Sequence, residues 1–272
     1  MHKQTLVWGE NMIPYYHFTS LENFYKILAT GKLILTKCNS LKNVTIETMA
    51  LEATLKNLLK TEREFLYEKF GCNNDQDVIN KNMNYREKSY MICFSKDKNE
   101  NIAIQNDYLW KYYADNNQGV IIKFDYTKFP YKSHGSQSIN GERISEFRIL
   151  HMLYEEETFK NKIKEKEDYL DVLYLDSYKP NFCSLENEIR FIVFLKEPSD
   201  LGTTNLMHKV SNHDIRRITA QEYSGNRPQY LLYDIISKEG NETAIEKVFC
   251  KDKETYNRLK QILNNNILID LL

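Results

Sequence analysis

The chain has 272 residues, 42% of them hydrophobic and 28% charged, and its 37 basic residues balance 38 acidic ones. This composition is typical of a globular protein that is long enough to bury a large core. The near-neutral balance removes net charge as an argument for nucleic-acid or membrane binding, although it does not exclude nucleic acid as a substrate.

Residues 14–38 are predicted to form a strand, a helix and a second strand. Tyr15–Phe18 is short and aromatic, and residues 33–36 are apolar. Between these strands, apolar side chains recur at helical spacing. Ser20 is placed to cap the start of the helix, and Gly31 to supply the left-handed position at its end.

The rest of the chain mixes helical and strand patterns without regular alternation. Residues 46–70 indicate one long helix, and residues 72–89 a loop or weak helix. Further helices are expected at 106–116, 155–178 and 253–265, strands at 89–95, 119–126, 146–154, 187–195 and 244–250, and loops with short edge strands at 200–243. This order predicts an α+β fold with mixed or antiparallel sheets flanked by helices, in a single domain over residues 1–272.

Several common functional motifs are missing. The sequence has no GxGxxG, GxxxxGK[ST], HExxH or GxSxG, and its six histidines show no metal-ligand spacing, so we expect no metal site. Its five cysteines are scattered without a CxxC pair, which favours reduced thiols in a cytoplasmic protein. The first residues contain no long apolar segment, so neither a signal peptide nor a membrane span is expected.

The stretch His17-Phe18-Thr19-Ser20 is the first candidate for a ligand site. Side chains alternate along a strand, so His17 and Thr19 point to one face. An imidazole and a hydroxyl on one face can hydrogen-bond a ribose diol or a carboxamide. Alternatively, His17 is a buried residue bonded to the backbone and Ser20 is an ordinary helix cap.

A second candidate combines Ser95, at the end of a predicted strand, with Trp110 and Tyr113. The two aromatic residues lie three positions apart and so share one helical face. They could form the walls of a slot for a flat ring, or they could be core anchors, as helical aromatic residues usually are.

The third candidate is the alternation of Glu186, Glu188 and Arg190 along a predicted strand, while Ile189 and Phe191 face the core. Burying an unpaired carboxylate costs several kcal/mol, so three charges beside an apolar strand need partners or a solvated face. One interpretation is a solvent-exposed ladder of ion pairs. The other is a carboxylate held for proton transfer or for stabilising a cation, with Arg190 fixing its ionised form.

Together, the three stretches resemble the bacterial domain-of-unknown-function 2971 family over residues 14–265. That family's pattern is H-Y-T-S with a helix and G-x-L, then S-F-S, W-x-x-Y-A…G and W-x-x-E-x-E-x-R. The matching residues here are His17, Thr19, Ser20, Gly31, Leu33, Phe94, Ser95, Trp110, Tyr113, Ala114, Gly119, Glu186, Glu188 and Arg190, with Lys179 upstream. Cys183 replaces the second tryptophan, and Asn43-Val44 replaces an Asn-Asp pair, although Glu47 matches.

The opening residues 17–33 are also similar to the first strand and helix of ADP-ribosyltransferase-fold proteins. That resemblance implies NAD as a substrate, with His17 and Thr19 or Ser20 at its ribose and carboxamide. It also implies that Ser95, Tyr113 or Trp110 shapes the nicotinamide pocket and that a late-strand glutamate is catalytic. Glu188 is preferred to Glu186 on the expectation that Arg190 and apolar neighbours bury it more deeply.

The predicted function is therefore an NAD-dependent ADP-ribosyltransferase or NAD glycohydrolase, acting as a bacterial toxin or antiphage effector. Its acceptor would be nucleic acid, protein or water, and a protein partner could neutralise it. Two alternatives stay open. One is a non-catalytic module that senses nucleotides or nucleic acid, and the other is a partner-binding domain whose Glu/Arg strand is solvated.

Overall fold

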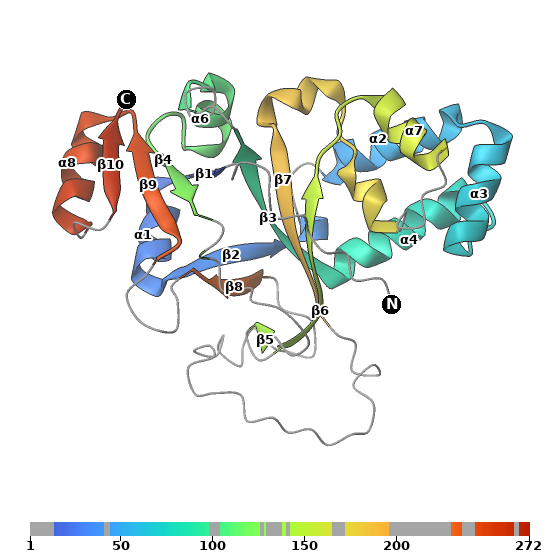
Figure 1. The fold of residues 1–272 in the computed structure, drawn as a ribbon, viewed down its shortest axis with the longest axis horizontal. Coiled ribbons are helices and arrows are strands. Elements are labelled where there is room, and N and C mark those ends of the chain that lie inside the picture. The colour runs from blue at the N-terminus through green and yellow to red at the C-terminus, as the bar shows by residue number, and fades with distance from the viewer. Residues whose placement is uncertain are drawn as a thin grey trace, which may run out of the picture.

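A computed structural model describes residues 14–40, 44–97, 104–125, 128, 138–139, 142–164, 172–195, 230–235, 243–263 and 267–272. Within these ranges a mixed sheet runs through the molecule and helices flank it, which confirms the predicted α+β class (Figure 1). The strands are β1 (Tyr15–Thr19), β2 (Lys32–Lys37), β3 (Ser89–Lys96), β4 (Val120–Phe124), β5 (Ser138–Ile139), β6 (Glu142–His151), β7 (Glu188–Leu195), β8 (Tyr230–Asp234), β9 (Ile245–Cys250) and β10 (Leu268–Leu271). The α-helices are α1 (Leu21–Thr30), α2 (Val44–Asn57), α3 (Lys60–Phe70), α4 (Asp75–Lys88), α6 (Asp107–Tyr113), α7 (Glu156–Lys164) and α8 (Lys253–Ile262). The 3₁₀-helices are η1 (Cys38–Ser40), η3 (Val172–Ser177) and η4 (Asn181–Glu186).

The sheet forks at β3. Its strand order is β10-β9-β4-β1-β3-β7-β6-β5, with β2 also paired to β3 and β8 paired to β2. Along one edge, β3 pairs with β7. Its other edge is shared by two strands: residues 36–37 of β2 pair with residues 90–91, and residues 15–16 of β1 pair with residues 95–96. Residues 92–94 therefore lie between the two branches.

Separate apolar cores hold the two halves of the fold. The sheet and helices α1 and α8 share one cluster, which includes Phe24, Phe94 and Leu259. Helices α2, α3, α4 and α7 pack on each other in a second cluster around Leu55 and Phe159. We call these four helices the helical cluster; in Figure 1 they gather on one side of the sheet, beyond β6 and β7.

The predicted strand–helix–strand at the start of the chain is confirmed. The Oγ of Ser20 accepts a hydrogen bond from the backbone N–H of Asn23 at 3.2 Å and so caps α1. Gly31 ends the helix with φ of 65°, in the left-handed region that favours glycine. These local signals set where α1 begins and ends between β1 and β2.

The prediction of one helix over residues 46–70 is wrong, because this segment forms two helices, α2 and α3. The chain breaks at Leu58 and Leu59, where the Glu62 carboxylate accepts a hydrogen bond from the Leu59 N–H at 2.8 Å. This turn allows Leu58 and Leu66 to reach the same core. A continuous apolar pattern did not reveal the break. Gly71 ends α3 with φ of 61°, in the left-handed region that favours glycine.

The segment expected to be a loop or weak helix is the 14-residue helix α4. Its buried face includes Asn82 and Arg86, so the hydrophobic pattern underestimates it. Residues 155–178 also differ from the prediction, because the described part contains α7 and the separate η3. Within 200–243, β8 is the only strand assigned, and residues 200–229 and 236–242 lie outside the described residues. The short strand β10 was not predicted.

No helix in the described ranges combines the length and apolar character needed to cross a bilayer.

Candidate functional site

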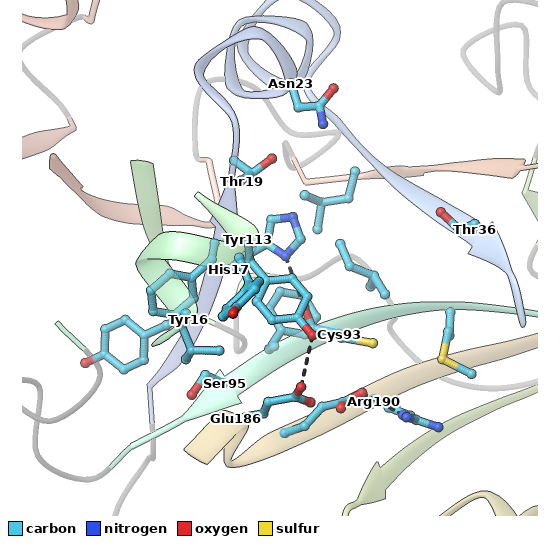
Figure 2. A pocket seen from close by; sticks show the side chains of 18 of the residues that line it. Tyr16, His17, Thr19, Asn23, Thr36, Cys93, Ser95, Tyr113, Glu186 and Arg190 are labelled. Carbon is cyan, nitrogen blue, oxygen red and sulfur yellow. Dashed lines mark hydrogen bonds and ion pairs between the residues drawn. The ribbon is translucent and has the colours of Figure 1, made fainter. Parts of the chain in front are cut away.

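A cavity of about 840 Å³ opens in the fork of the sheet. Its lining comes from β1, the start of α1, β2, β3, α6, Glu47 of α2 and the segment around Lys179 to Arg190. The volume lies in the range of about 300–1,000 Å³ that small-molecule sites occupy. His17, Glu186 and Glu188 all line this one cavity, so the N-terminal strand and the late acidic segment meet there. His17 and Glu186 are labelled in Figure 2.

The fork positions His17 through its backbone neighbour on β3. His17 Nδ1 lies 3.0 Å from the carbonyl oxygen of Cys93, on the part of β3 that neither branch covers. Burial lowers the pKa of His17 although this hydrogen bond opposes the change, so the ring is neutral near pH 7. Because a carbonyl can only accept, Nδ1 carries the proton and Nε2 is a hydrogen-bond acceptor. His17 is thus both bonded to the backbone and part of the cavity wall.

The predicted hydroxyls line the cavity as well. The Ser20 side chain is engaged as the cap of α1. The Thr19 and Ser95 residues are only 5% and 7% exposed, and neither hydroxyl has a hydrogen-bond partner among the described residues. Neither hydroxyl oxygen is among the fully buried side-chain atoms that lack a partner in the described residues, so both open onto the cavity. These two are therefore available to a molecule in the cavity.

A left-handed residue brings the two glutamates to the same place. Glu186 is the last residue of η4, not part of the strand as predicted, and β7 begins at Glu188. Asn187 lies between them with φ of 42° and ψ of 48°, a conformation that asparagine tolerates better than most residues. Arg190 follows on the same face of β7, and Ile189 packs in the core as expected.

The interpretation of these charges as a solvated ladder is wrong. Glu186 and Glu188 are each 5% exposed and Arg190 is 1% exposed, and β7 lies between β3 and β6 inside the sheet. The two glutamates have the same exposed fraction, so exposure alone does not separate them. The difference between them lies in their partners.

Glu188 is held in its ionised form. Its Oε1 accepts a hydrogen bond from Arg190 Nε at 2.6 Å, and its Oε2 accepts one from Lys179 Nζ. Burial alone would raise the pKa of Glu188, but Arg190, Lys179 and these hydrogen bonds hold it well below the ordinary value.

Glu186 has weaker compensation for its burial. Lys179 Nζ lies 2.5 Å from its Oε2, and the Tyr113 hydroxyl donates to its Oε1 at 2.9 Å, the contact drawn in Figure 2. Burial raises the pKa of Glu186 above the ordinary value, and the negative charge of nearby Glu188 raises it further. Lys179 lowers this pKa but does not cancel the effect of burial. Glu186 is consequently the better placed of the two to accept a proton, because its pKa lies above the ordinary value and that of Glu188 lies below it.

Two important charged residues were not among the predicted site residues. Lys179 bridges both glutamates, and both oxygens of Glu47 contact Arg190, at 2.5 Å and 3.2 Å. Both positions match the family pattern noted above, and this was the available signal. Neither has a motif that identifies it by spacing alone.

The charged network continues into the helical cluster. Arg86 of α4 donates to Glu47 at 3.0 Å and to Asp176 at 2.6 Å, and Asn82 donates to Asp176 at 2.9 Å. All these side chains are buried. The network therefore joins the helices to β7 and fixes the floor of the cavity.

The two aromatic candidates on α6 have different roles. Tyr113 lines the cavity, and burial and Glu186 raise the pKa of its hydroxyl, so it remains a hydrogen-bond donor. Trp110 does not line the cavity. It is fully buried, its Nε1 donates to the Ile104 carbonyl at 2.6 Å, and its ring packs edge-on against Phe18. The core interpretation is thus correct for Trp110, and the binding-site assignment is wrong.

Among the described residues, no group of three or more histidine, cysteine or carboxylate side chains is arranged to hold a metal ion. Comparison with models of known families, with curated proteins and with solved structures finds no match to this chain. The family resemblances stay predictions, and the evidence that bears on function lies in the cavity.

Proposed function

We propose that this chain cleaves the nicotinamide–ribose bond of NAD and transfers ADP-ribose to an acceptor or to water. The observation that carries this proposal is one cavity lined by His17, by buried hydroxyls and by the paired carboxylates of Glu186 and Glu188. In the proposal, the forked sheet is the ADP-ribosyltransferase-like fold that the opening segment suggests.

The charges suit this reaction. When the bond between ring nitrogen and C1′ breaks, nicotinamide leaves with the electron pair and the ribose becomes an oxocarbenium-like cation. In the proposed pose, the ionised Glu188 lies near this cation and stabilises it. The acceptor oxygen then attacks C1′, and its proton passes to Glu186, whose raised pKa makes it the better base of the two.

The polar groups suit the rest of the dinucleotide. The cavity extends from the charged floor to the first turn of α1. In Figure 2, Asn23 of this turn lies at the end of the cavity away from Glu186 and Arg190. A helix N-terminus favours phosphate groups. In this pose, Thr19, Ser95 and His17 Nε2 hydrogen-bond the ribose hydroxyls, and Tyr113 packs against the nicotinamide ring.

Release of nicotinamide from NAD by the purified protein tests the proposal, with water, nucleic acid and protein offered in turn as acceptors. Glu188→Gln and Glu186→Gln should each lower the rate by at least about 100-fold. Glu246→Gln is the matched control, because Glu246 is a β9 residue paired with Lys123 near the surface and does not line the cavity. A wild-type protein that releases no nicotinamide with any acceptor would end the proposal.

A cellular role as a toxin or antiphage effector follows from the same proposal. Expression in bacteria should deplete NAD and stop growth, and Glu188→Gln should not. Rescue by a co-expressed protein would identify a neutralising partner. Normal growth with active enzyme present would contradict the toxin role but leave the activity intact.

A second function, nucleotide binding without turnover, is favoured by one observation. Both oxygens of Glu188 are already held by cations, as in a purely structural ion pair. This alternative predicts that NAD raises the melting temperature while no nicotinamide is released, since a ligand that binds only the native state stabilises it.

A further inference from the structure

Acidic side chains outnumber basic ones in the lining of the cavity. Four carboxylates line it, from Glu47, Asp115, Glu186 and Glu188, and two cationic side chains, Lys179 and Arg190, oppose them. His17 adds no charge near pH 7, because burial lowers its pKa. Both cations are engaged by the glutamates. The acidic end of the cavity therefore has no cation left unpaired to receive an anionic group.

Aromatic side chains form much of the wall next to these carboxylates. Tyr108 and Tyr113 of α6 both direct their hydroxyls to Glu186, at 3.5 Å and 2.9 Å. Tyr112, beside them on the same helix, is exposed and also lines the cavity. Aromatic faces beside carboxylates are the usual way in which proteins bind organic cations.

Two hydroxyls that open onto the cavity limit the kinds of ligand that fit here. Thr19 and Ser95 are more than nine-tenths buried, line the cavity and have no hydrogen-bond partner among the described residues. A simple metal ion would not need aromatic walls, and an apolar ligand would leave both hydroxyls without partners. A planar ring with polar substituents and a positive charge suits the carboxylates, the aromatic wall and the two hydroxyls.

We infer that this cavity selects a planar, positively charged ring over its neutral counterpart. The ligand class is inferred from the lining of the cavity, and only the choice of nicotinamide as the test ring rests on the proposed function. Applied to NAD, it predicts that the oxidised form, with its cationic ring, binds more tightly than the reduced form, with its neutral ring.

The test compares N1-methylnicotinamide, a cation, with neutral nicotinamide, using ligand-observed NMR titration of the full chain at equal ionic strength. Neither probe can be cleaved by transfer to an acceptor, so binding is measured apart from catalysis. We expect the cation to bind at least about tenfold more tightly. Equal affinities, tighter binding of the neutral ring, or no binding of either at millimolar concentration would overturn the inference.

Asp115→Asn tests the charge without disturbing the buried network. Asp115 is exposed, has φ of 50° that asparagine also adopts, and forms no ion pair among the described residues. The substitution should reduce the preference for the cation about threefold. Asp107→Asn is the control, because Asp107 is an exposed residue of α6 that pairs with Lys251 and does not line the cavity.

The two proposals can fail separately. Preferential binding of the cation without any release of nicotinamide from NAD would support the charge selectivity and reject the enzymatic function. Release of nicotinamide with equal binding of the two probes would do the reverse. An unchanged preference in Asp115→Asn together with a reduced one in Asp107→Asn would also contradict the assignment of the charges.

Discussion

Replacing Arg190 with methionine removes the cation at the centre of the buried network while keeping a long side chain. Arg190 donates to Glu188 at 2.6 Å, to both oxygens of Glu47 at 2.5 Å and 3.2 Å, and to the Asp176 carbonyl at 3.2 Å. In Arg190→Met, two buried carboxylates lose a cationic partner. Removing one member of a buried ion pair typically costs about 3–5 kcal/mol, because the remaining charge stays desolvated.

The remaining partners set the upper limit of this effect. Lys179 still contacts Glu188, and Arg86 still donates to Glu47 at 3.0 Å. We therefore expect the free energy of unfolding to fall by about 3–5 kcal/mol, and not by the larger sum of four separate charged hydrogen bonds.

The measurement is urea unfolding followed by far-ultraviolet circular dichroism, with Arg258→Met as the control. Arg258 is paired with Glu254 four residues earlier on α8, and both side chains are exposed. Loss of an exposed pair of this kind costs about 0–1 kcal/mol. If Arg190→Met costs no more than Arg258→Met, the network is not holding buried charges and the reasoning is refuted.

A double-mutant cycle makes the test sharper. In Arg190→Met, the Glu47 carboxylate stays buried after losing its contacts with Arg190. Glu47→Gln removes the charge of that carboxylate. The double variant should therefore be destabilised by less than the sum of the single variants, with a coupling of about 1–3 kcal/mol. Strict additivity would show that the two side chains do not depend on each other.

Three further outcomes are expected. Tyr113→Phe removes a hydrogen-bond donor to Glu186, so the pKa of that carboxyl should rise further. The acidic limb of the pH–rate profile should then shift to higher pH. A shift to lower pH would contradict the role of Glu186 as the base. Gly119→Ala places a methyl group against the backbone carbonyl of Thr19 and should cost about 1–3 kcal/mol in urea unfolding; a neutral result would contradict this close packing. Because the folded state lowers the pKa of Glu188, its contribution to stability is present above the ordinary value of 4.5 and is lost as the pH falls through the lower folded pKa. The melting temperature should therefore fall less steeply below pH 4.5 in Glu188→Gln than in the wild type, and equal slopes would be inconsistent with this linkage.

Local signals in the sequence were enough for most individual elements. The cap at Ser20, the left-handed Gly31 and the β-branched and aromatic run of β7 depend on neighbours a few residues away. Hydrophobic periodicity fails to predict a helix whose buried side chains are polar or charged. Helix α4 places Asn82 and Arg86 in the interior, where charged partners from other segments satisfy them, so its hydrophobic periodicity is weak.

The sequence by itself therefore determined the α+β class, the start of the fold and the types of residue at the site, because capping, periodicity and alternation act over short distances. Only the tertiary structure decided which charges share a cavity. Glu47, Lys179 and Arg190 come from separate segments, and a buried charge can be assigned a role only once its partner is known. The same dependence separates Tyr113, at the cavity, from Trp110, three residues away and in the core.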